Sequence, residues 1–124
     1  ARRAEIWATY DAELADWAEE HRVVTPTIPA EMEQTYHMYY LLLPSLDVRS
    51  RLIDHLKQQG IYAAFHYQPL HLSDMGRQFG GVEGDCPVTE DVADRLLRLP
   101  LYYALTEDEQ REIIQNLYQF TNWL

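Results

Sequence analysis

The chain is poor in cysteine and in basic residues. Its 124 residues contain one cysteine, Cys86, and ten Lys and Arg against twenty Asp and Glu, which gives a formal net charge of −10. A single cysteine cannot form an internal disulfide, and no second cysteine is spaced to complete a zinc site. Because nucleic acids are bound through clustered Lys and Arg, the acidic balance argues against nucleic acid as the main partner.

Long apolar runs and several common catalytic motifs are also missing. No apolar stretch approaches the ~20 residues that cross a bilayer, and the N-terminus lacks the charged-then-apolar pattern of a signal peptide. We therefore expect a cytoplasmic protein with no membrane partner. The serines lack a G-x-S-x-G setting, and no glycine-rich fingerprint follows a strand and opens a helix. Neither a nucleophilic triad nor a dinucleotide site is predicted.

Residues 1–35 are expected to form a connecting helix and linker, and residues 36–124 a small α/β domain. The first helix, Arg2 to Glu20, has one apolar stripe, formed by Ile6, Trp7, Tyr10, Leu14 and Trp17. This stripe fits core packing or contact with a missing neighbour. No Ser, Thr, Asp or Asn precedes the helix to cap it, which favours a chain that continues upstream. The proline-containing stretch from His21 to Gln34 predicts an extended connector.

Three strands and four helices are expected in residues 36–124. The predicted strands are Tyr36–Leu43, Ile61–Phe65 and Arg98–Leu101, and the predicted helices are Val48–Gln59, Ser73–Phe79, Pro87–Leu97 and Thr106–Trp123. The first strand is apolar on both faces, so we expect it to be central, although the third strand could also insert between the first two. The predicted fold class is α+β, with a small antiparallel or mixed three-stranded sheet and helices packed on one face.

The candidate site follows the second predicted strand, which we expect to be buried. A loop around Pro69 carries four side chains able to bind a ligand or move protons: His66, Tyr67, Gln68 and His71. Polar groups at the C-terminal end of a strand often line a crevice, although two solvated histidines would give the same pattern. Their spacing of five across a proline matches no standard metal-ligand pattern, and no third ligand is signalled.

Five motifs in a fixed order resemble one family. They are Tyr36–Tyr40, Gln59–Ile61, His66–His71, Asp85–Glu90 and Leu99–Leu101. Together they are similar to the C-terminal domain of the nucleotide-sugar aminotransferases of the DegT/StrS type, pyridoxal-phosphate enzymes of the aspartate aminotransferase fold. The resemblance covers nearly the whole chain, from about Ile6 to Trp123.

The resemblance implies a homodimer in which a large N-terminal domain, absent here, holds pyridoxal phosphate on a lysine. Glutamate would supply the amino group for the C4 keto group of a TDP-4-keto-6-deoxy sugar. The amino sugar would serve lipopolysaccharide or other surface polysaccharides, including the enterobacterial common antigen. The implied substrate-binding residues are His66, Tyr67 and His71, with Gln68 as a secondary candidate. Lys57, the only lysine, is expected on the outer face of a helix, so the chain alone should be inactive.

Two other hypotheses remain open at this stage. An autonomous ligand-binding or interaction module without a cofactor predicts that Trp7 and Trp17 are both buried. The fragment hypothesis instead predicts exposed apolar area along the first helix or the sheet face. A histidine-based hydrolase or metalloenzyme is the third possibility.

Overall fold

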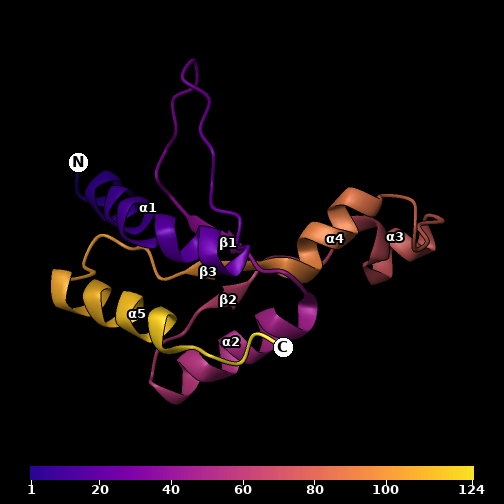
Figure 1. Ribbon diagram of the computed structural model, residues 1–124. Helices are drawn as coiled ribbons and strands as arrows, with labels where there is room; N and C mark the ends of the chain where they lie inside the picture. The colour runs from indigo at the N-terminus through magenta and orange to yellow at the C-terminus, as the bar shows by residue number, and fades with distance from the viewer.

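The computed structural model describes residues 1–124 and contains five α-helices, three strands and one short 3₁₀ helix. In chain order they are α1 (Arg2–His21), β1 (Tyr39–Leu42), α2 (Leu46–Gln58), β2 (Ala64–Phe65), η1 (Leu70–Leu72), α3 (Asp74–Gln78), α4 (Pro87–Arg95), β3 (Leu96–Leu99) and α5 (Glu107–Gln119). Figure 1 shows α1, α2 and α5 gathered around the sheet, with α3 and α4 projecting to one side. None of these helices is both long and apolar enough to cross a membrane.

The strands form one antiparallel sheet in the order β1-β3-β2. β1 pairs with β3 from Tyr39↔Leu99 to Leu42↔Leu96, and β2 pairs with β3 through only two residues. The third strand therefore inserts between the first two, and the expectation that Tyr36–Leu43 is central is wrong. The outer edge of β1 has only an isolated bridge to Val24, so its apolar character reflects the core beneath it and not a strand on each side.

Several predicted elements have different limits or burial in the structure. The first strand begins at Tyr39 and not at Tyr36, and the third strand ends at Leu99 and not at Leu101, because the pairing of β1 with β3 runs only from Tyr39↔Leu99 to Leu42↔Leu96. The helix predicted to reach Leu97 ends at Arg95, because Leu96 and Leu97 pair with β1 and begin β3 two residues earlier than expected. The second strand is not buried, since only Ala64 and Phe65 form it and both are exposed. β2 is an edge strand, so only Ile61, just before it, enters the core.

The core lies on the sheet face that contains Tyr39, Leu41, Leu97 and Leu99. The rings of Tyr10 in α1 and Tyr39 in β1 stack with their centroids 5.3 Å apart. Side chains of α1, α2 and α5 belong to the same cluster of 21 buried residues. The apolar stripe of the first helix is therefore core packing, and α1 is continuous with the domain that follows.

Local signals set most helix ends. The Ser45 hydroxyl accepts a hydrogen bond from the Val48 amide at the start of α2, and Gly60, with a φ of 76°, follows its end. Thr106 and Glu109 form the predicted capping box of α5. α5 ends at Gln119 and not near Trp123, because Phe120 turns to an extended conformation and is buried.

Residues 25–38 extend away from the sheet and its helices as two antiparallel segments joined by a turn (Figure 1). The Val24–Leu42 bridge closes the base, and the Met32 amide donates to the Pro29 carbonyl at the tip. Apart from the turn at 30–31, these residues have no regular structure before β1, as the connector prediction stated for residues up to Gln34.

Candidate functional site

The loop His66–His71 leaves the sheet at the end of β2 and leads into η1, α3 and α4 (Figure 1). We call residues 66–95 the arm. The arm exposes large apolar side chains, with Tyr67 at 75%, Leu70 at 85% and Phe79 at 86%. Trp7 and Trp17 are buried, as the cofactor-free alternative predicts, and no large apolar side chain of α1 is exposed. Exposed apolar side chains lie on the arm and also elsewhere, for example at Met32, Phe65 and Tyr103.

His71 is held by a residue of α4. Its Nε2 lies 2.6 Å from Oε1 of Glu90, and the two side chains are 15% and 22% exposed. The Glu90 carboxylate also accepts hydrogen bonds from the Gly84 and Cys86 amides. The hydrogen bond from His71, followed by those from the two amides, lowers the pKa of Glu90 below its usual range. This ring nitrogen of His71 therefore already has a partner within the arm.

Two glycines let the arm fold tightly. A Cβ on Gly76 would overlap the backbone oxygen of Leu70, and a Cβ on Gly81 would overlap that of His71. Ser73 caps α3 by accepting from the Gly76 amide at 3.1 Å. The backbone that follows the loop is thus fixed by close contacts on the α3 side and by Glu90 on the α4 side.

His66 and Tyr67 are the two predicted residues whose side chains lie against each other. Their ring centroids are 5.0 Å apart in an edge-to-face arrangement. His66 is half-buried and its Nδ1 is buried without a hydrogen-bond partner, whereas Tyr67 is mostly exposed. Gln68 is exposed, and its amide nitrogen donates to the Leu72 carbonyl. The structure therefore brings His66 and Tyr67 together and gives Gln68 and His71 bonds within the arm.

Arg98 joins this pair from the middle strand, and sequence analysis did not single it out. Its guanidinium carbon lies 5.7 Å from the centre of the Tyr67 ring, and its Nε is buried without a partner. The register pairs Arg98 with Tyr40 on one side and Ala64 on the other. These residues form the sheet face opposite the core. A single charge inside the apolar stretch LLRLPL was the available signal.

Two separate hollows are lined by residues of this candidate site. One, of about 180 Å³, is lined by His37, Met38, Tyr62, Ala64, Arg98, Leu99, Pro100 and Leu101. The other, of about 400 Å³, lies between the loop and α4 and is lined by His66, Tyr67, Gln68, Pro69, Leu70, Val88, Thr89, Val92, Ala93 and Leu96. Each places a histidine beside apolar side chains, and neither contains a carboxylate.

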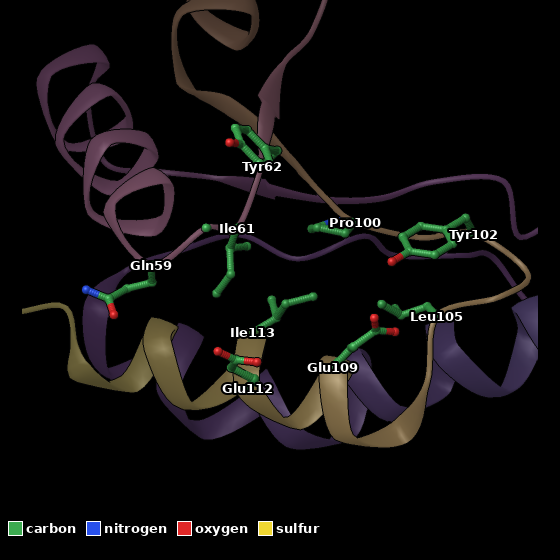
Figure 2. Close-up of a pocket in the computed structure, with 10 residues that line it drawn as sticks. Gln59, Ile61, Tyr62, Pro100, Tyr102, Leu105, Glu109, Glu112 and Ile113 are labelled. Atoms are coloured by element: carbon green, nitrogen blue, oxygen red, sulfur yellow. The ribbon is translucent and has the colours of Figure 1, made fainter.

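A third hollow, of about 310 Å³, lies between the end of α2 and α5. Figure 2 shows Ile61 and Ile113 facing each other across it, with the Tyr102 hydroxyl pointing inward. Glu109 and Glu112 line it from α5, but the Glu109 carboxylate already binds Thr106. None of the predicted site residues reaches this hollow, so we do not assign the candidate site to it.

The chain offers no place for a covalently held aldehyde cofactor. Lys57 is exposed in the last turn of α2, as predicted. No group of three His, Cys, Asp or Glu side chains is arranged to hold a metal ion. The side chains that could contact a ligand at this strand end are His66, Tyr67 and Arg98.

Comparison with known proteins gives a consistent result. Residues 1–118 match the model of the DegT/DnrJ/EryC1/StrS aminotransferase family. The chain is 34% identical over 117 residues to the uncharacterized protein MJ1066 of Methanocaldococcus jannaschii, covering 91% of this chain and 30% of that protein. It is 31% identical over 114 residues to the dTDP-4-dehydro-2,3,6-trideoxy-D-glucose 4-aminotransferase of Saccharopolyspora spinosa, covering 90% and 27%.

A solved structure confirms the fold. The PLP form of the putative sugar aminotransferase Spr1654 from Streptococcus pneumoniae superposes with a TM-score of 0.83 at 26% identity. The match covers 95% of this chain and 30% of that one. The chain thus spans about 30% of the length of the proteins it resembles.

Proposed function

Because this chain belongs to the DegT/DnrJ/EryC1/StrS aminotransferase family, whose members depend on pyridoxal phosphate, we propose that it is the C-terminal, substrate-side domain of a sugar aminotransferase. The observation that carries this proposal is the match over residues 1–118 together with the coverage of about 30% of each relative. The remaining 70% would include the large domain that holds the cofactor.

The residues of this chain do not fit the cofactor. The only lysine is exposed on a helix turn, and no buried amine is available to hold an aldehyde. The cofactor, when bound by the large domain, supplies the electron sink for amino transfer. We therefore propose that the 124-residue chain is inactive alone and contributes only to substrate binding.

We propose that the full-length enzyme transfers the amino group of glutamate to the C4 keto group of a TDP-4-keto-6-deoxy sugar. The Saccharopolyspora spinosa relative, named for action on a dTDP-4-dehydro sugar, supports this substrate class. The finer proposal is a TDP-4-oxo-6-deoxy-D-glucose transaminase, which would make a precursor of enterobacterial common antigen or of another surface polysaccharide. A cytoplasmic homodimer is part of the same proposal.

Within this chain, His66 and Tyr67 would contact the sugar, because their rings meet at the strand end and the buried Nδ1 of His66 has no partner. Gln68 would be a secondary contact. His71 would act as a positioning residue, since its Nε2 is bonded to Glu90. Its role would be to hold the loop in place through α4.

The first test is to purify the natural gene product and measure its mass, its visible absorption and its products. We expect a polypeptide about three times as long as this chain, a visible band from bound pyridoxal phosphate, and conversion of the keto sugar and glutamate to an amino sugar and 2-oxoglutarate. A natural product of 124 residues with no visible band would contradict the proposal and favour the cofactor-free binding module.

The second test separates the two half-reactions in the full-length enzyme. We expect His66→Ala to slow the reaction with the keto sugar at least about tenfold more than the reaction with glutamate, because the lost contact is to the sugar. Lys57→Ala, an exposed change outside the site, is the control and should leave both reactions unaltered. Equal losses in both half-reactions would indicate a cofactor or folding effect instead.

A further inference from the structure

The hollow between the end of α2 and α5 is separate from the candidate site and has the composition of a small-molecule site. Its volume is about 310 Å³, which is at the lower end of the range for ligand pockets, about 300–1,000 Å³. Ile61, Leu105 and Ile113 provide the apolar part of its lining, and Figure 2 shows Ile61 and Ile113 facing each other across it. Ligand sites combine such an apolar surface with a few polar groups that converge on it.

Three polar side chains of this lining have no partner within the chain. The Tyr102 hydroxyl points into the hollow and makes no hydrogen bond (Figure 2). The Glu112 carboxylate belongs to no ion pair, and the Gln59 amide makes no hydrogen bond. Glu109 differs, because its carboxylate accepts hydrogen bonds from the Thr106 amide and hydroxyl. Tyr102, Glu112 and Gln59 are therefore available to a bound molecule.

The charge at this hollow is negative. Glu109 and Glu112 line it, and no Lys, Arg or His does. The hydrogen bonds from the Thr106 amide and hydroxyl lower the pKa of Glu109, so this carboxylate is ionised at neutral pH. Lys57 is exposed and outside the lining, and Arg111 forms an ion pair within α5 and lines a different hollow. A cation with an apolar body therefore complements both parts of the lining, whereas an anion would be repelled.

We propose that this hollow binds a small organic cation, an ammonium group carried on an apolar body. The apolar body lies against Ile61, Ile113 and the Tyr102 ring, and the ammonium group donates to the Glu112 carboxylate. The site does not depend on the proposed function, because none of the predicted site residues lines this hollow. Pro100 lines both this hollow and the one at Arg98, so the bound cation lies next to the candidate site without being part of it.

The test is a titration of the isotopically labelled chain, whose buried cluster of 21 residues comes entirely from its own elements, followed by nuclear magnetic resonance. The probes are phenethylammonium, the uncharged 2-phenylethanol of nearly the same size, and 3-phenylpropionate, which is an anion. Ionic strength is kept constant and low, because salt screens exposed charges.

We expect phenethylammonium to shift the Ile61 and Ile113 methyl signals and the Tyr102 ring signals saturably, with a dissociation constant on the order of 10 mM. The alcohol should bind about threefold to fivefold more weakly, because it lacks the pair with an exposed carboxylate, and the anion more weakly still. The His66 ring signals should not move, because His66 lines a different hollow.

Two matched pairs of variants locate the site. Tyr102→Ala and Tyr103→Ala each remove an exposed tyrosine ring, but only Tyr102 lines the hollow. Glu112→Gln and Glu107→Gln each remove one exposed negative charge of α5, but only Glu112 lines the hollow. We expect Tyr102→Ala to weaken the binding of ammonium and alcohol alike by at least about threefold, because both lose the ring. Glu112→Gln should weaken only the ammonium, by about threefold to fivefold, and both control variants should change binding less than about twofold.

Three results would overturn the proposal: no saturable shift with phenethylammonium, equal binding of the three probes, or equal losses in a variant and its matched control. The same titration of the natural full-length protein must also shift the Tyr102 ring signals, and their failure to shift there would equally overturn it. The assignment as an aminotransferase domain would survive any of these results, because it is tested by the cofactor band and the amino transfer of the natural protein.

Discussion

Replacing Arg98 with methionine should make the chain more stable. The buried Nε has no hydrogen-bond partner, and an unsatisfied buried donor costs about 1–3 kcal/mol. The side chain is only half-buried, so the lower end of this range applies. The contact of the guanidinium with the Tyr67 ring stabilises the folded state by about 0.5 kcal/mol at a partly exposed site and offsets part of this cost. Methionine has a similar length and adds apolar contact. We therefore expect a gain of about 0.5–1 kcal/mol in the free energy of unfolding.

Arg95→Met is the matched control, because Arg95 is also half-buried and immediately precedes the same strand. Its guanidinium donates to the Leu43 carbonyl at 3.2 Å and to the Asp91 carboxylate at 2.7 Å. The mutation should lower the free energy of unfolding by about 1–2 kcal/mol, most of it from the carbonyl that loses its partner. The Asp91 pair adds less, because that carboxylate is largely exposed. The two substitutions should thus act in opposite directions.

Urea unfolding followed by tryptophan fluorescence measures both changes, since Trp7 and Trp17 are buried in the core. With a slope of about 2 kcal/mol per molar urea, a gain of 1 kcal/mol raises the midpoint by about 0.5 M. If Arg98→Met destabilises the chain as much as Arg95→Met does, the charge of Arg98 supports the fold. The cost assigned to the unpaired Nε would then be wrong.

Three further predictions test the core, a helix end and the arm. Leu14→Ala, at a fully buried position of α1, should cost about 2–5 kcal/mol in a single urea transition; a loss below about 1 kcal/mol would mean that α1 is not part of the core. Thr106→Ala removes the capping box of α5 and should cost about 1–2 kcal/mol in the same assay, and an unchanged midpoint would contradict the assigned cap. The lowered folded-state pKa of Glu90 means that its stabilising effect is present above the ordinary carboxyl range and is lost as the pH falls through the lowered value. Glu90→Ala should therefore make the free energy of unfolding depend less on pH at acid pH, and it should remove hydrogen-exchange protection of the Gly84 amide. Retained protection of this amide would show that the arm does not depend on the Glu90 carboxylate.

Helix positions could be predicted from the sequence where the signals are local. Thr106 and Glu109 lie three residues apart, and Gly60 directly follows the last turn of α2, so both limits are visible without tertiary information. The apolar spacing of α1 likewise predicted its buried stripe.

The strand limits depended on distant pairing. Leu96 and Leu97 fit the apolar stripe of a helix as well as they fit a strand, and only their partners Leu42 and Leu41 decide between the two. The same is true of burial in β2, where Phe65 is an apolar residue that is 60% exposed because its strand lies at the sheet edge. A single sequence contains no record of which strand occupies the middle.

In the candidate site, too, the features set by neighbouring residues could be predicted, and those set by distant contacts could not. The sequence placed His66 and Tyr67 at a strand end, and the structure brings these two rings together. It could not indicate that His71 would bond to Glu90, nineteen positions later, nor that Arg98 would come to lie beside Tyr67. These contacts arise from the arm folding back and from the insertion of β3, which are both long-range events.

The central position of β3 also determines the order in which the domain can be completed. β1 and β2 do not pair with each other, and, apart from the bridge between Val24 and Leu42, each is paired only with the strand that is synthesised last. A nascent chain that ends before Leu96 therefore cannot form this sheet, and the β3 partners of Tyr39–Leu42 lie more than fifty residues further along the chain. Closing so long a loop slows folding. The pairing of Leu96–Leu99 is thus what joins β1 and β2 into one sheet, and α5 must follow before the core is complete.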